Sequence, residues 1–196
     1  MRKKIYFLLV LIISSSFLQA QKMEVGFTLS LLSNNSIAQF GNAYMDDASR
    51  TVGNSETYGL TFLKPLNNWL DMETGIEFLK CEATVQSMIP SYSENIHKSF
   101  ISVINIPIDV RANFWKYCFV NGGVLVDVDV SQNSPFDSQT GLGCELGVGL
   151  KYDFKTGISI FVNPYSKIHA LIPVTFNTNN LHLLESAVRF GVAYHF

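Results

Sequence analysis

The sequence predicts an all-β fold: an eight-stranded, antiparallel, up-and-down transmembrane β-barrel preceded by a cleavable signal peptide. Three observations lead to this prediction. Eight segments of the chain alternate between apolar and polar residues, as strands with two different faces do. The connections between them alternate between long and short, which places all short turns and both barrel termini on one side. The last segment ends the chain on an aromatic residue, Phe196.

Residues 1–20 have the three-part layout of a secretory signal peptide. Basic residues at 2–4 precede an apolar run at 5–13, and the most plausible cleavage site follows Ala20. The apolar run is too short for a spanning helix, which needs about 20 residues. We therefore predict a signal peptide at residues 1–20 and a single barrel domain at residues 21–196, exported through the inner membrane.

The composition excludes several classes of protein. Of 14 basic and 16 acidic residues, three basic ones lie in the signal peptide, so the mature chain carries 11 − 16 = −5. This acidic balance argues against nucleic-acid binding, which needs a basic patch. Although 47% of the residues are hydrophobic, no long apolar run follows the signal, which excludes a helical membrane protein. Three cysteines are too few for a disulfide framework, and Cys118 and Cys144 fall on apolar faces.

The first four strands are predicted at residues 22–32, 56–64, 69–84 and 99–114. In the first, Val25 and Phe27 belong to the apolar face and Glu24 to the polar face, and the others alternate in the same way. Polar loops are expected at residues 33–55 and 85–98, and a tight turn at residues 65–68. Pro107 interrupts the fourth strand and predicts a bulge or a local bend.

The last four strands are predicted at residues 117–130, 141–154, 158–172 and 185–196. The fifth is the clearest, because its valines alternate with polar residues such as Asn121 and Asp127. Tight turns are expected at residues 115–116 and 155–157, and longer connections at residues 131–140 and 173–184.

The closing strand resembles the last strand of outer-membrane barrels. In those proteins a polar-x-Gly-x-x-aromatic-x-aromatic motif is read by the barrel-insertion machinery. The matching residues here are Arg189, Gly191, Tyr194 and Phe196. The resemblance implies that this machinery is a partner.

Alternation alone also fits a soluble lipocalin-like barrel, whose apolar face points inward. Three features favour the membrane barrel: aromatic residues gather beside the short turns, the polar face is rich in glycine, and that face carries charges of both signs. The predicted aromatic girdle comprises Trp69, Phe114, Trp115, Tyr117, Tyr152, Phe154, Tyr194 and Phe196. The predicted interior polar network comprises Glu73, Glu77, Asp109, Arg111, Asp127, Asp129, Glu145, Lys151, Lys167, His169, Glu185 and Arg189.

The mature chain resembles the PorT-like family of small eight-stranded outer-membrane β-barrels. The resemblance rests on the signal peptide and on three stretches: Ile106-Pro-Ile-Asp-Val110, Asn121-Gly-Gly123, and Asn163-Pro-Tyr165 to Phe196. It implies an outer-membrane barrel. The family's namesake is associated with a protein-secretion apparatus, and most members have no assigned biochemical role.

The chemical alternatives are weaker than a structural role. Asp127, Asp129 and Glu145 should meet on neighbouring strands and could bind a hard cation such as Ca²⁺, but Lys167 and His169 on the next strand favour an ion-pair network. An eight-stranded interior is filled by side chains, which argues against a pore. We therefore predict no metal and no cofactor.

His169 with Glu185 or Arg189 could suggest a lipid-modifying barrel enzyme, but the chain has no His-x-Ser pattern. His97 and His182 are expected in solvated loops. We therefore predict a non-enzymatic protein of the outer membrane, with a structural or adhesive role or a place in an envelope complex. Its partners would be outer-membrane lipids and an envelope protein bound by the long loops. An outer-leaflet lipid- or sugar-modifying enzyme and a soluble ligand-binding barrel remain the alternatives.

Overall fold

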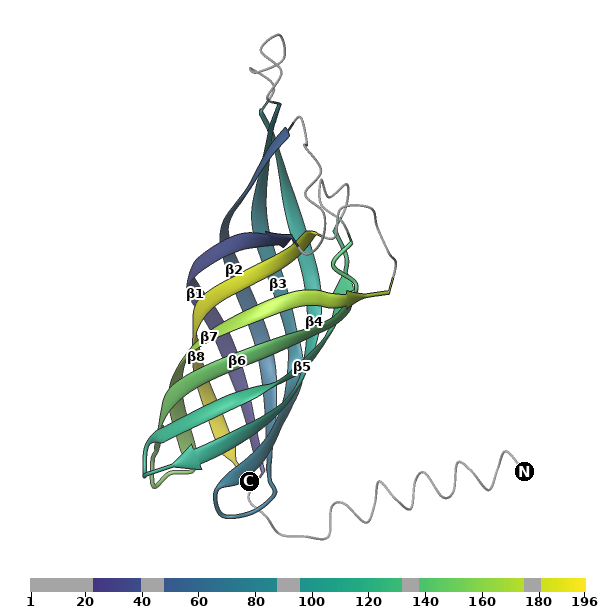
Figure 1. Ribbon diagram of the computed structural model, residues 1–196. Coiled ribbons are helices and arrows are strands. Elements are labelled where there is room, and N and C mark those ends of the chain that lie inside the picture. Colours follow the sequence, from purple (N-terminus) through teal and green to yellow (C-terminus); the bar gives the residue numbers. More distant parts are fainter. Residues whose placement is uncertain (1–22, 40–47, 88–95, 132–137, 175–180) are drawn as a thin grey trace, which may run out of the picture.

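The described residues form a closed, all-β barrel. The computed structural model describes residues 23–39, 48–87, 96–131, 138–174 and 181–196, so the predicted signal peptide lies outside the described residues. Within them, eight antiparallel strands follow one another around the wall, and the first pairs with the last (Figure 1). The predicted eight-stranded up-and-down barrel is therefore confirmed.

The strands differ in length. They are β1 (Glu24–Gln39), β2 (Ala48–Pro65), β3 (Leu70–Ser87), β4 (Ile96–Phe114), β5 (Cys118–Asp129), β6 (Gly141–Asp153), β7 (Ile158–Pro173) and β8 (Leu181–His195). The three tight turns and the C-terminus lie at one end of the barrel, here called the turn end (Figure 1). The opposite end, from which β2, β3 and β4 extend furthest, is called the loop end.

The predicted loop at residues 33–55 is largely wrong, because β1 continues to Gln39 and β2 begins at Ala48. Most residues of these segments are polar, with only isolated apolar residues such as Ile37 and Val52, so the alternation that marks a strand is absent from them. Backbone pairing with neighbouring strands nevertheless keeps them extended. Leu32 has a positive φ of 55°, and beyond it β1 pairs only with β8, since its ladder with β2 ends at Ser30.

Of the bulge or local bend expected at Pro107, the bulge is wrong. The β4–β5 register is unbroken from Val103 to Phe114. The β3–β4 ladder instead has a gap, without a change of register, between the pairs Thr74↔Ile108 and Glu77↔Asn105. Proline has no N–H to donate, so pairing is lost beside it. The Thr74 hydroxyl donates to the Pro107 carbonyl at 2.8 Å across this gap.

The three short turns form where they were predicted. In the β2–β3 turn, the Asn67 side-chain oxygen accepts hydrogen bonds from the backbone N–H groups of Trp69 (3.0 Å) and Leu70 (2.9 Å). In the β6–β7 turn, Gly157 has φ = 84°, a conformation that favours glycine. Local hydrogen bonds and glycine geometry thus fix the turn end of the barrel.

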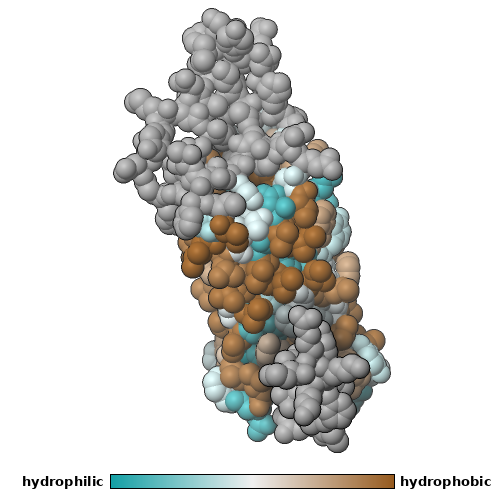
Figure 2. All heavy atoms as spheres, turned by 90° about the vertical axis from the view of Figure 1, so that its right-hand side faces the viewer, coloured by the Kyte–Doolittle hydropathy of each residue, from teal (hydrophilic) through white to brown (hydrophobic). Residues whose placement is uncertain are grey.

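The predicted apolar faces point outward and the polar faces inward. Along β6, Leu146 and Val148 are exposed, while Glu145 and Gly147, which alternate with them, are buried. Hydrophobic side chains cover most of the visible wall in Figure 2. Among the described residues, no helix combines the length and hydropathy that crossing a membrane requires.

Candidate functional site

The barrel interior is filled by stacked layers of side chains, beginning with a polar cluster at the turn end. Lys151 forms ion pairs with Glu24 (2.5 Å) and Asp153 (3.4 Å), and His195 Nδ1 lies 3.5 Å from Glu24. Ser159 donates to Glu24 at 3.3 Å. Lys151 was predicted to join the interior network, but the structure places it in this separate, partly exposed cluster.

Arg111 occupies the next layer. Its Nε donates to Glu73 Oε2 at 2.9 Å, and its Nη2 lies 2.7 Å from the same oxygen. The guanidinium carbon lies 4.1 Å from the centroid of the Phe119 ring and 5.1 Å from that of Phe161. Arg111 is fully buried. Aromatic faces and one carboxylate therefore hold this cation between the turn-end cluster and the charges above it.

Arg189, on the closing strand, is the central cation of the barrel. Its Nη2 lies 3.0 Å from Glu77 and 3.2 Å from Glu145, and its Nη1 lies 4.0 Å from Glu73. It also donates to the side-chain oxygen of Asn163 at 3.4 Å. These partners come from β3, β6 and β7, so one side chain joins distant parts of the wall.

Lys167 completes a ring of alternating charges with Arg189. Its ammonium group pairs with Glu77 and, at 3.1 Å, with Glu145, the two carboxylates that also contact Arg189. All four side chains are almost wholly buried. Because an unpaired buried charge is costly, each member stabilises the others. We call Glu73, Glu77, Arg111, Glu145, Lys167 and Arg189 the interior ion network.

His169 lies above this network, towards the loop end, and bridges two carboxylates. Its Nδ1 is 3.2 Å from Asp127 and its Nε2 is 3.2 Å from Glu185. Glu185 also accepts hydrogen bonds from Tyr165 (2.6 Å) and Thr57 (3.0 Å). A neutral imidazole has only one N–H, so donation to both carboxylates requires the protonated ring. His169 therefore acts as a buried cation.

The proposed meeting of Asp127, Asp129 and Glu145 does not occur. In the β5–β6 register, Asp127 lies opposite Gly141, and Glu145 lies opposite Gly123. Asp129 instead accepts hydrogen bonds from the backbone N–H groups of Ser131 and Gln139, at 2.8 Å each. No group of three or more His, Cys, Asp or Glu side chains suited to a metal ion is found in the part of the chain that the structure describes.

Inward-facing glycines make room for the larger side chains of the interior. A Cβ on Gly143 would come within 2.7 Å of the Asp127 carboxylate, and one on Gly147 within 2.6 Å of Asn121. Gly149 and Gly191 are covered by the rings of Phe119 and Phe161, their partners across the ladder. The glycine-rich polar face thus reflects the crowding of a narrow barrel.

An apolar cluster closes the interior towards the loop end, and sequence analysis missed it. Its buried members are Leu79, Cys81, Ala83, Ile101, Val103 and Leu183. The signal was present, because Leu79 and Cys81 continue the inward-facing parity of Glu73 and Glu77. It was overlooked because apolar residues were expected only outside. His182 beside this cluster is buried in β8, and His97 lies in β4, so their placement in loops was wrong.

Two neighbouring buried polar groups of β4 lack protein partners. The Asp109 carboxyl has no hydrogen-bond donor among the described residues, and both amide atoms of Asn105 are likewise unbonded there. Asp109 faces the acidic Glu73 and Glu145, and only Arg189 nearby favours its charge. A buried carboxylate without a donor is destabilising.

We therefore expect Asp109→Asn to leave the barrel as stable as the wild type or up to about 2 kcal/mol more stable, because a neutral amide beside Glu73 and Glu145 avoids the repulsion of a third carboxylate. Glu73→Gln is the matched comparison and should be destabilising, because Glu73 is bonded to Arg111. Urea unfolding of both variants in detergent measures the free energies. A large loss of stability in Asp109→Asn would show that this carboxylate has a partner.

The eight residues of the predicted aromatic girdle are all exposed and flank the tight turns and the C-terminus. Tyr117 stacks on Tyr152 with ring centroids 5.8 Å apart, and Phe154 meets Tyr152 edge-on at 4.9 Å. Phe114 and Trp115 form a further edge-on pair at 5.5 Å. The turn end therefore carries a belt of outward-facing rings.

Two solved structures share this architecture. The outer membrane protein OprG from Pseudomonas aeruginosa aligns with a TM-score of 0.56 and 14% identity, covering 91% of this chain and 97% of that one. The outer membrane protein AlkL, solved in DMPC lipid bilayers, aligns with a TM-score of 0.57 and 15% identity, covering 90% of each chain. This chain has the fold of small outer-membrane barrels. No protein-family profile and no curated protein sequence matches it.

Proposed function

We propose that this protein is an integral, non-enzymatic β-barrel of the outer membrane, exported by its signal peptide. The observation that carries the proposal is the distribution of polarity across the wall. Outward side chains such as Leu146, Val148 and Phe190 are exposed and apolar, whereas the charges of the interior ion network are buried. In water this arrangement would expose a large apolar surface. In a bilayer the apolar face would contact lipid, while the charges pair inside the barrel.

The alternative of a soluble ligand-binding barrel requires the opposite arrangement. Its apolar face would line an internal cavity. Here the inward face holds paired charges, and the space beside the loop-end apolar cluster, between Ile101, Gln139 and Leu183, measures about 10 Å³. That is about the smallest space that holds one water molecule, and it is far below the size of a ligand site.

The geometry of His169 argues against the enzyme alternative. Both ring nitrogens contact carboxylates and the side chain is fully buried, so no nitrogen is free to accept a proton from a substrate. The outward Ser166 and Ser186 hydroxyls hydrogen-bond to each other at 2.9 Å. The contacts of His169 support a structural role for it.

We further propose that the protein contacts an envelope partner through its four longer connections, as an adhesive or structural component. These connections, residues 40–47, 88–95, 132–137 and 175–180, lie outside the described residues, and the strand ends that flank them are at the end opposite the short turns. The rigid, charge-paired interior would hold their anchoring strands in place. A place in the PorT-like family, and with it a role in secretion, is part of the proposal, and only the sequence stretches described above support it.

The proposal predicts heat-dependent electrophoretic mobility. The protein should be found in the outer-membrane fraction, and unboiled samples should migrate differently from boiled ones, because a closed barrel resists unfolding by detergent at room temperature. A soluble protein whose mobility is the same before and after boiling would contradict the proposal. Deletion of one connection should preserve the mobility shift while abolishing binding of the envelope partner.

A further inference from the structure

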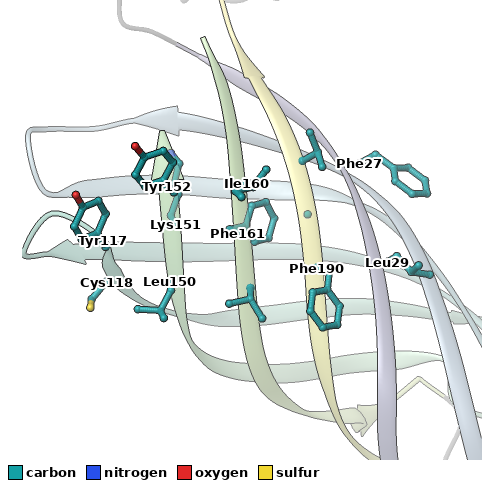
Figure 3. Close-up of a pocket in the computed structure, with 13 residues that line it drawn as sticks. Phe27, Leu29, Tyr117, Cys118, Leu150, Lys151, Tyr152, Ile160, Phe161 and Phe190 are labelled. Atoms are coloured by element: carbon teal, nitrogen blue, oxygen red, sulfur yellow. The ribbon is translucent and has the colours of Figure 1, made fainter. Parts of the chain in front are cut away.

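A groove crosses the outer wall from the turn end towards the middle of the barrel. It has a volume of about 890 Å³ and is lined almost wholly by apolar side chains of β1, β5, β6, β7 and β8 (Figure 3). Figure 3 shows Tyr117 and Tyr152 at one end of the lining and Phe27 and Leu29 at the other. Every strand on this side of the barrel contributes to it.

Two rows of outward side chains form the walls of the groove. Strand register places Cys118, Leu150, Val162, Phe190 and Leu29 next to one another in one row. Tyr152, Ile160, Val192 and Phe27 form the second row. The longer row crosses four intervals between neighbouring strands. At about 4.8 Å per interval, the groove is about 19 Å long.

The groove rises through about one leaflet of a bilayer. Tyr152 lies one residue from the end of β6, whereas Leu29 lies five residues from the start of β1. Five residues of a strand tilted by about 40° climb roughly 13 Å, which is close to half of the ~25 Å apolar band of such barrels. One end of the groove therefore lies at the membrane surface and the other near the midplane.

The turn end of the groove carries polar and basic groups. The Lys116 ammonium lies 5.2 Å from the centre of the Tyr117 ring, and Tyr117 stacks on Tyr152. The hydrogen bond with Tyr117 raises the pKa of Lys116, which remains a cation at physiological pH. Lys155 lies in the adjoining β6–β7 turn, and both lysines are exposed. These groups suit an anionic phosphate at the membrane surface.

We propose that this groove binds one phospholipid of the leaflet at the turn end, with an acyl chain between the two rows of side chains and its phosphate beside Lys116 and Lys155. The inference rests on the proposed membrane location. Apolar length, depth of the groove and the position of the positive charges all fit this ligand. A closely fitted lipid would bury more apolar surface than a mobile one on a smooth wall, and it would dissociate more slowly.

Native mass spectrometry of the folded barrel with added phosphatidylglycerol tests the site. The groove variant Val162→Phe/Val192→Phe fills the space between the rows. The matched control Val124→Phe/Val128→Phe adds the same side chains to outward positions of β5 away from the groove. We expect one retained lipid on the wild type and on the control, and about tenfold less on the groove variant. Diacylglycerol with the same chains should be retained less well than phosphatidylglycerol.

Equal lipid retention by the groove variant and the control would overturn the site, because binding would then reflect the general apolar surface. Equal retention of diacylglycerol would overturn the role of the phosphate. Heat-dependent mobility is measured first on every variant. A wild type that lacks it refutes the membrane barrel and the lipid site together, whereas a heat-modifiable wild type that retains no lipid refutes the site alone.

Discussion

Replacing Arg189 with methionine is expected to destabilise the barrel by about 3–5 kcal/mol, because the change leaves buried carboxylates without their central cation. Among the described residues, the cation left to Glu77 and Glu145 would then be Lys167, and the cation left to Glu73 would be Arg111. A loss of this size is a large part of the typical stability of a domain, about 5–15 kcal/mol. The free energy of unfolding is measured by urea titration in detergent, with the heat-modifiable band as the signal of the folded barrel.

Two further variants separate charge from position. Lys151→Met removes a cation from the turn-end cluster and should cost less, since Glu24 keeps its hydrogen bond from Ser159 and its contact with His195, and the second partner, Asp153, is exposed. Glu145→Gln in the Arg189→Met background should recover part of the lost stability, because it removes one of the orphaned charges. If Arg189→Met is as stable as the wild type, then the interior ion network does not support the barrel.

Gly191→Ala is expected to destabilise the barrel by about 1–3 kcal/mol through overpacking, because the new methyl group would enter the space of the Phe161 ring. That ring cannot easily move away, since it meets Phe119 edge-on at 6.3 Å and lies beside the Arg111 guanidinium. Gly53→Ala is the matched control, because its nearest neighbours would lie at 3.4 Å, an ordinary contact. Chemical unfolding of the two variants provides the comparison.

Gly191 could be needed for packing against Phe161 or for reading by the insertion machinery, and a double variant distinguishes the two roles. Gly191 belongs to the closing-strand motif that resembles the signal read by the insertion machinery. If its role is packing, Phe161→Ala should relieve the clash, so the double variant should be more stable than the sum of the two single changes predicts. If its role is recognition, purified Gly191→Ala should fold normally in detergent while its insertion in cells fails. An additive double variant would exclude the packing explanation.

The sequence determined the strands of the barrel wall and the direction in which their side chains point. The alternation along residues 141–154, for example, is a local property, since each residue of a strand faces opposite to its neighbours. The tight turns were equally predictable, because Asn67 and Gly157 act through local geometry. The sequence also identified most of the buried charges, since a charged residue at an inward-facing position of a barrel strand lies inside the barrel.

Only the tertiary structure decided which of these groups meet. Asp127 and Glu145 are separated by the hairpin register, whereas Glu77 and Lys167 are brought together across the interior from strands 90 residues apart. The strand segments at residues 33–39 and 48–55 lack clear alternation and are held by contacts with other strands: backbone pairing, side-chain hydrogen bonds such as that of Asn35 with the Gly53 carbonyl, and packing of Ile37 and Val52 on the loop-end apolar cluster. The physical reason is that side-chain direction depends on one strand, whereas contacts inside a barrel depend on the register and closure of all eight.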